Sequence, residues 1–197
     1  MNEKGRRRGW AVGAVCICAA ALAGATAAAP PEMTVVAGGG VAGFADGVGS
    51  DARFNKPIRL APFGPDAVLV ADIFNHAIRS VSKNGRVRTI AGSPDRKGHE
   101  DGPAATARFA SPHGVGTAPD GRIAVAEAEG QTLRLLTPTA GAAGRIAIIA
   151  GVEGQAGSDG SHLNRPAAVL VHAGWLWIAD LDNHRICAVP LGTGGRE

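Results

Sequence analysis

The strongest constraint on the fold of this chain is an internal repeat of about 54 residues, present three times. Each copy begins with an Ala-Gly pair, at Ala37, Ala91 and Ala150, and runs through a Gly-rich stretch containing Asp-Gly to a proline. The three prolines are Pro57, Pro112 and Pro166, at intervals of 55 and 54 residues. Repeats of this length indicate supersecondary units that stack, because one unit alone cannot bury its apolar face.

Each copy contains short apolar segments rich in Val, Ile and Ala, separated by turn residues. In the first copy these segments are 58–61, 67–72, 77–81 and 87–92, and Asn84-Gly85 marks a hairpin between the last two. No window shows a sustained helical period, so the segments are predicted to be strands. Four short antiparallel strands per unit predict an all-β fold made of β-propeller blades.

The predicted strands are distributed unevenly among the copies. The third copy ends after its third strand, near Val189, whereas "MTVVAG" at 33–38 matches the fourth strands "VRTIAG" and "IAIIAG". The chain is therefore predicted to hold about three four-stranded blades in permuted order, at about 33–92, 93–151 and 152–191.

Three blades are fewer than the usual four to eight. Three explanations are open. Two chains form one six-bladed ring and exchange their first strands, the chain is a fragment of a longer propeller, or it is an arc that leans on another protein.

The first 27 residues are predicted to be a signal peptide. Basic residues from Lys4 to Arg8 precede an uncharged apolar run, and Ala25-Thr26-Ala27 fits a cleavage site. Residues 28–32 are then a linker and 192–197 a tail, and the mature protein is periplasmic or extracellular. The alternative is a membrane anchor that stays uncleaved, since residues 9–29 are uncharged and long enough to span a bilayer.

The basic balance of the chain resides in this leader. The net charge is +3, the leader alone carries +3, and the remainder is neutral, so no nucleic-acid partner is predicted. Beyond the leader the sequence contains one cysteine, Cys187, so the mature chain cannot form an internal disulfide. Cys187 aligns with Arg79 and Arg134, positions expected to face outward, where a thiol can join two copies in a homodimer.

The repeat signature resembles a known family. The stretches "ADIFNHAIRSVSKNGRVRTIAG" (71–92) and "ADLDNHRI" (179–186), with Ala-x-Phe-x-x-Pro before the first two blades, are similar to the NHL repeat over 34–189. The resemblance implies a propeller, usually of six blades. The second copy departs from the pattern, since "AEAEGQTL" (126–133) replaces the Asp and Asn-His positions.

Polar residues that recur after the second predicted strand are candidates for a binding surface on one rim. The opposing hypothesis, which the recurrence favours, is turn chemistry, because Asp and Asn side chains accept backbone N–H bonds in tight turns. Two arginines in the inter-blade loops are a candidate anion-binding face or a solvated rim, beside apolar residues expected to wedge between blades. The candidates are Asp72, Asn75, His76, Asp180, Asn183, His184, Arg53 and Arg108.

Candidate chemistry beyond this rim is sparse. His113 follows Pro112 at the start of a predicted inner strand and is a weak candidate ligand for a Ca or Zn ion in the central channel. No catalytic residue and no cofactor are assigned, because no nucleophile elbow, phosphate loop or HExxH motif occurs.

The sequence thus favours an exported scaffold that binds a protein, peptide or glycan over an enzyme. The alternative hypothesis is a secreted propeller lyase or lactone hydrolase with a channel metal, classes whose fold the NHL family resembles. A purely structural arc is the third hypothesis.

Overall fold

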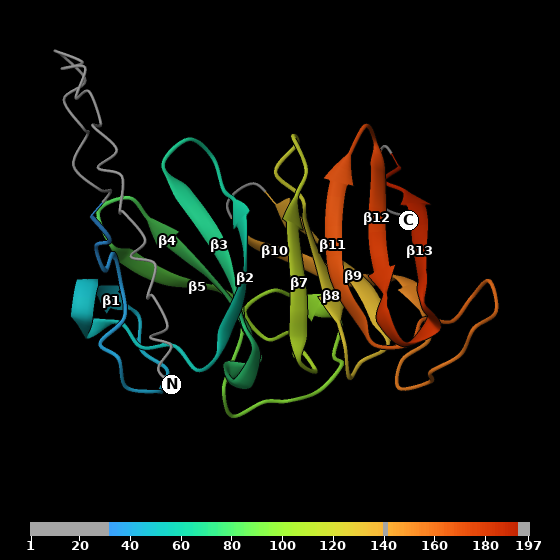
Figure 1. Cartoon of the computed structure of the whole chain (residues 1–197), viewed down its shortest axis with the longest axis horizontal. Coiled ribbons are helices and arrows are strands. Elements are labelled where there is room, and N and C mark those ends of the chain that lie inside the picture. Colours follow the sequence, from blue (N-terminus) through green and yellow to red (C-terminus); the bar gives the residue numbers. More distant parts are fainter. Residues whose placement is uncertain (1–31, 140–141, 193–197) are drawn as a thin grey trace, which may run out of the picture. The chain divides into compact units, whose positions relative to one another are not determined.

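The computed structural model describes residues 32–139 and 142–192. The predicted signal peptide, residues 28–31 of the predicted linker and residues 193–197 lie outside this range. Figure 1 shows that the described part is a row of antiparallel sheets in chain order. Within this part, no helix is long and apolar enough to cross a membrane.

The first two sheets have five strands each. The first has the order β1-β5-β4-β3-β2, with β1 Gly47–Val48, β2 Pro57–Pro62, β3 Ala67–Asp72, β4 Ala77–Ser82 and β5 Arg86–Gly92. The second has the order β6-β10-β9-β8-β7, with β6 Gly102–Pro103, β7 Pro112–Thr117, β8 Ile123–Glu127, β9 Thr132–Thr139 and β10 Ala142–Gly151. In each, four strands are the predicted ones and the fifth is a two-residue strand from the preceding loop.

The third sheet has three strands in the order β11-β12-β13, with β11 Pro166–His172, β12 Trp175–Asp180 and β13 Arg185–Pro190. A short 3-10 turn, η2 Ile73–Asn75, joins β3 to β4, and another, η3 Leu181–Asn183, joins β12 to β13. A third, η1 Gly49–Asp51, follows β1. The inner strands β2, β7 and β11 contact one another in sequence. The all-β prediction is confirmed, and the three sheets match partial propeller blades.

Apolar side chains fill the space between neighbouring blades. Leu69 and Ile78 of the first blade pack with Val115, Ile123 and Phe109 of the second. Leu133 of the second blade packs with Leu163 and Ile178 of the third. Phe109 and Leu163 are buried there, as predicted for wedges between blades. The core is therefore divided into layers, each of which needs a blade on both sides.

The predicted strand at 33–38 does not form. No strand is assigned to these residues, and the Val35 side chain is 80% exposed. The physical reason is topological, because this segment precedes the first blade while the three-stranded sheet is the last one. The Gly38 N–H donates to the Gly49 carbonyl at 2.9 Å, but no neighbouring strand continues this pairing along the segment. The prediction of a fourth strand in the third blade is therefore wrong for a single chain.

Candidate functional site

The predicted rim residues lie at one end of the sheets, where the second strand of each blade ends and the inner strand begins. Two kinds of segment meet there: the turns η2, 128–131 and η3, and the long loops before the three repeat prolines. These segments form the lower edge of the row in Figure 1.

Asp72 is the centre of a buried network in the first blade. Its carboxylate accepts hydrogen bonds from the Asn55 backbone N–H (2.7 Å), from Asn75 Nδ2 (2.7 Å) and from Arg79 Nη1 (3.0 Å). Asn75 Nδ2 also donates to the Gly43 carbonyl at 2.8 Å. Asp72 and Asn75 are therefore brought together, but they are buried and hold loop backbone.

Arg79 completes this network from β4. Its Nη2 donates to the Ala45 carbonyl (2.8 Å) and to Asp46 (2.6 Å), and its Nη1 donates to the Arg53 carbonyl (3.2 Å). The guanidinium also lies 4.5 Å from the centroid of the Phe44 ring. The side chain is 0% exposed, so the expectation that this position faces outward is wrong. An arginine can be buried here because carboxylates and loop carbonyls surround its charge.

Glu127 takes the place of Asp72 in the second blade. Its carboxylate accepts hydrogen bonds from the Ala110 N–H (2.7 Å) and from Thr132 Oγ1 (2.9 Å), and Arg134 Nη1 lies 3.6 Å away. Burial raises the pKa of Glu127 to about 7. The second copy, which departs from the family pattern in sequence, therefore keeps the same support for its loop.

Arg134 in the second blade is as buried as Arg79, so the outward expectation is wrong here too. Its guanidinium donates to the Glu100 carbonyl at 2.7 Å, to the Arg108 carbonyl and to the Asp101 carboxylate. The loop of residues 100–108 is thus held from beneath by one side chain.

The third blade supplies the guanidinium from a different strand position. Asp180 accepts from the Asn164 N–H (2.6 Å) and from Asn183 Nδ2 (2.8 Å), as Asp72 does from its equivalents. Its guanidinium partner is Arg185, whose Nε lies at 2.7 Å and whose Nη2 donates to the His162 carbonyl at 2.8 Å. Cys187 occupies the repeat position of Arg79, and its Sγ lies 3.8 Å from Asp180.

The three arginines were missed as site residues from the sequence. One signal for Arg79 and Arg134 was available, because a charged residue stood at the same position of two otherwise apolar strands. No such signal existed for Arg185, since its repeat equivalents are Ala77 and Thr132.

The basic residues of the inter-blade loops lie across glycines. A Cβ built on Gly43 would lie 3.1 Å from Cδ of Arg53, and one on Gly98 would lie 3.1 Å from Cδ of Arg108. Arg53 is exposed, whereas Arg108 is half-buried and pairs with Glu100 at 2.8 Å. Each arginine therefore lies over its own loop.

The two histidines of the candidate set adopt the same backbone conformation. His76 and His184 have φ of 48° and 53° and end the turns η2 and η3. His184 is exposed, while His76 is half-buried and its pKa is lowered, chiefly by burial. Among the described residues, no hydrogen bond or ion pair joins the two polar triplets, so the structure places one network in each blade.

His113 lies half-buried on β7, and its Nδ1 is 3.0 Å from the Ser111 carbonyl oxygen. In the ranges 32–139 and 142–192, no three His, Cys, Asp or Glu side chains are grouped so as to hold a metal ion. His113 therefore belongs to no such group of three within these ranges.

The outermost layer of the rim differs from blade to blade. At one repeat position the exposed residue is Phe74, Glu129 or Asp182. Each has a basic neighbour: Lys56 Nζ lies 4.3 Å from the Phe74 ring centroid, Lys97 pairs with Glu129, and Arg165 lies 3.1 Å from Asp182. The supported backbone is thus alike in the three blades, and the chemistry displayed on it is not.

Comparison with known proteins gives similarity in structure alone. No family model matches the sequence, and no curated protein matches it significantly. Two auxiliary nutrient binding proteins, from Bacteroides thetaiotaomicron VPI-5482 and Bacteroides ovatus ATCC 8483, have similar solved structures, each with a TM-score of 0.55 at 21% and 20% identity. The matches cover 70% and 72% of this chain but only 37% and 39% of theirs.

A protein of unknown function from Bacteroides thetaiotaomicron is similar as well, with a TM-score of 0.56 at 23% identity over 61% of this chain and 31% of that one. These similarities support the propeller-type fold. The chain matches less than half the length of each of these proteins.

Proposed function

We propose that this protein is an exported, NHL-type propeller module that binds a protein, peptide or glycan ligand on the rim described above. The observation that carries the proposal is a buried carboxyl group beneath the rim of each described blade, which lies beside a guanidinium and holds loop backbone. Loops held in this way lose little conformational freedom when they bind, and preorganisation of this kind lowers the entropic cost of binding.

The division of labour among the rim residues also supports binding. The buried members of the candidate set, Asp72, Asn75 and Asp180, hold the loops in place, while Arg53 and His184 remain exposed to a ligand. The buried residues that hold the loops are alike in the blades, while the exposed residues differ. A repeat scaffold acquires a particular ligand through such differences in its exposed residues. The leader predicted at 1–27 supports export, and the printed names of two similar structures describe nutrient binding by those proteins.

A ligand screen with matched variants tests this proposal. The purified protein is applied to an array of glycans and peptides, and affinity for each captured compound is measured for the wild type, for F74A and for R165A. The control is K83A, which removes an exposed lysine that pairs with Asp66 at the other end of the first blade.

We expect at least a tenfold loss of affinity in one rim variant and none in K83A. Binding that survives both rim variants contradicts the proposal. Chemical conversion of a captured compound would instead favour the enzyme alternative, as would a stoichiometric metal that is lost in the variant H113A.

A further inference from the structure

The packing between blades defines two complementary apolar faces. The trailing face of a blade, which points toward the next blade, carries Leu69 and Ile78 in the first blade. The leading face, which receives it, carries Val115, Ile123 and Leu136 in the second blade. All of these side chains are buried, and the contact between the second and third blades repeats the arrangement.

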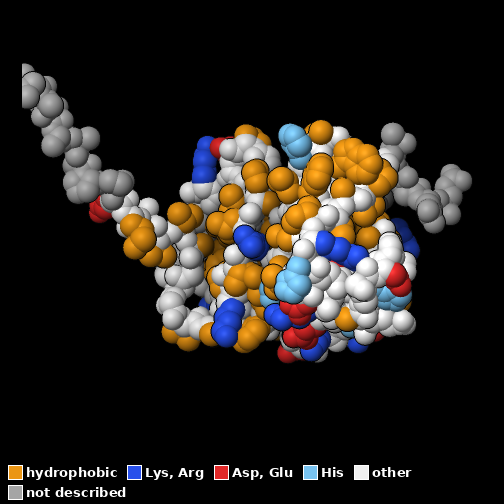
Figure 2. Space-filling view, turned by 45° about the vertical axis from the view of Figure 1, so that its right-hand side comes forward, with side chains coloured by type: hydrophobic (Ala, Val, Ile, Leu, Met, Phe, Trp, Pro, Cys, Tyr) orange, Lys and Arg blue, Asp and Glu red, His pale blue; other side chains and the backbone are white. Residues whose placement is uncertain are grey.

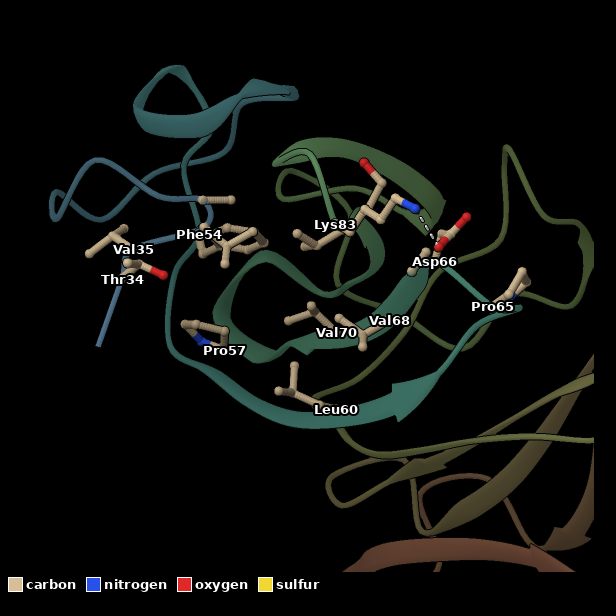
Figure 3. A pocket seen from close by; sticks show the side chains of 15 residues that line it. Thr34, Val35, Phe54, Pro57, Leu60, Pro65, Asp66, Val68, Val70 and Lys83 are labelled. Carbon is tan, nitrogen blue, oxygen red and sulfur yellow. Dashed lines mark hydrogen bonds and ion pairs between the residues drawn. The ribbon is translucent and has the colours of Figure 1, made fainter. Parts of the chain in front are cut away.

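The leading face of the first blade has no blade against it among the described residues. Its residues Leu60, Val68 and Val81 are the repeat equivalents of Val115, Ile123 and Leu136. They line a groove of about 670 Å³, together with Phe54, which is the equivalent of the wedge Phe109. Figure 3 shows Leu60, Val68 and Val70 pointing into this groove, with Thr34 and Val35 beside it.

The trailing face of the third blade is also open. Leu170, Trp177 and Ile186 are 63%, 43% and 68% exposed. Their equivalents in the first blade, Ala61, Leu69 and Ile78, are 6%, 0% and 1% exposed, since the second blade covers them. In Figure 2, hydrophobic side chains lie uncovered over much of the visible surface. One chain therefore carries both halves of the inter-blade contact, and within the described residues no further blade covers either half.

A free strand and a free sheet edge accompany these faces. The segment Thr34–Gly38 has the sequence of a fourth strand but no partner strand, and β13 has no strand on its outer edge in the described part. Gly38 has a φ of 105°, in the same left-handed region as Gly92 (87°) and Gly151 (84°), which end β5 and β10. The segment therefore already ends in the conformation of a fourth strand.

The segment also lies where a fourth strand of a preceding blade would lie. A Cβ on Gly92 would contact the ring of Phe109, and a Cβ on Gly38 would contact the ring of Phe54, its equivalent. β5 is the fourth strand of the first blade, and its end lies against Phe109 because the first blade precedes the second. The shared ring contact places Gly38 against the first blade as Gly92 lies against the second.

We propose that this missing blade is the third blade of a second copy of the chain. Thr34–Gly38 of each copy adds to β13 of the other, and the trailing face of each third blade packs onto the leading face of the other first blade. Such a contact joins two different surfaces, so it closes only as a ring. Two copies give six blades, the one multiple of three within the range of four to eight that propellers adopt. The inference does not depend on the rim proposal.

The first test places a charge on one face at a time. The variants L60D and W177D change residues that are exposed within one chain, so each chain keeps its own fold, which circular dichroism verifies. Burying an unpaired carboxylate in an apolar contact opposes association. The mass in solution, from light scattering after gel filtration, is expected to be that of two chains for the wild type and one chain for either variant. F74D, at the rim, is the matched control and stays a dimer.

Mixing the two variants tests the polarity of the contact. In the mixed pair one contact joins two unchanged faces, the trailing face of L60D and the leading face of W177D, and both carboxylates fall in the other contact. Because neither variant alone has an unchanged contact, the mixture is expected to form a two-chain species that neither variant forms alone. A wild-type monomer, or a W177D protein that remains dimeric, overturns the proposal. A mixture that stays monomeric contradicts the leading-to-trailing contact.

The second test traps the exchanged strand. In the first two blades, Arg79 pairs with Thr89 and Arg134 with Ile148, so the same register places Val35 opposite the partner's Cys187. Directly opposed residues of antiparallel strands lie about 4.5 to 5.5 Å apart at Cα, within disulfide range. In a C16S/C18S background, V35C is expected to form a disulfide-linked dimer on mild oxidation.

The control V41C places a thiol at another exposed valine, outside the segment. The second control, V35C/C187S, removes the acceptor. Equal cross-linking in V35C and V41C, or cross-linking of V35C that survives C187S, overturns the strand exchange.

Discussion

The first and third blades have an equivalent aspartate with equivalent hydrogen bonds, but the arginine that pairs with it comes from a different position on the strand. Asp72 and Asp180 each accept from a loop N–H and from an Asn three residues later. Arg79 then reaches Asp72 from the third residue of β4, whereas Arg185 reaches Asp180 from the first residue of β13. Each of these two blades thus has a guanidinium beside the buried aspartate, and the strand position that provides this guanidinium differs between them.

The difference has an energetic consequence. The Arg79 side chain is fully buried, while that of Arg185 is 32% exposed. Water therefore screens the charge in the third blade and can replace part of its hydrogen bonding. The same chemical change should accordingly cost more in the first blade than in the third.

Replacing Arg79 by alanine is expected to have the largest effect. The substitution leaves Asp72 buried without its cation and frees the carbonyls of Ala45 and Arg53. Breaking a buried pair in this way costs about 3–5 kcal/mol. Urea unfolding measures the loss, and K83A, which breaks an exposed pair with Asp66, is expected to cost about 1 kcal/mol or less.

Should R79A not fold, R79K keeps the charge and loses the planar fork, so a smaller but measurable loss is expected. A loss in R79A no larger than that in K83A would show that the network does not support the blade.

Replacing Arg185 by alanine is expected to cost less than replacing Arg79, because water already reaches part of the Arg185 side chain. The double variant R185A/C187R moves the guanidinium to the position that Arg79 occupies in the first blade. If the location of the charge alone matters, the double variant regains most of the lost stability in urea unfolding. The variant R185A/C187A serves as control. Equal stability of the two double variants would show that a guanidinium at position 187 does not replace the one at position 185.

The sequence was sufficient to predict the blades because each strand carries its own signal, an apolar run bounded by turns. The hairpin at Asn84-Gly85 and the wedges Phe109 and Leu163 follow from local patterns of the same kind. What could not be predicted depends on contacts between segments distant in the chain. Arg79 faces a loop more than 25 residues earlier, so its burial is invisible in a strand pattern that otherwise suggests a solvated position.

The segment 33–38 also shows that local sequence does not predict contacts between distant segments. Its composition predicts a fourth strand, but the pattern contains no information on which sheet, or which copy of the chain, offers an edge to it. Local sequence therefore predicts elements, and pairing within and between chains requires the geometry.

The middle blade adds a third case to the comparison, through the pH dependence of stability. Burial raises the pKa of Glu127 from 4.5 to about 7, so between these values the folded protein binds a proton that the unfolded chain has released. Stability contributed by this group is therefore full below about pH 4.5 and falls as the pH rises to about 7. Substitution E127Q mimics the protonated form and should change stability by about 1 kcal/mol or less at pH 4.5.

The measurement is the difference in unfolding free energy between the wild type and E127Q at a series of pH values. Carboxyls that do not interact with Glu127, such as Asp46, whose pKa is lowered, titrate alike in both proteins and cancel in this difference. We expect the wild type to lose stability relative to E127Q from pH 4.5 to 7 and the difference to level off above. A difference that stays flat, or rises with pH, would show that Arg134 compensates the burial of Glu127 and that the middle blade carries an ionised pair.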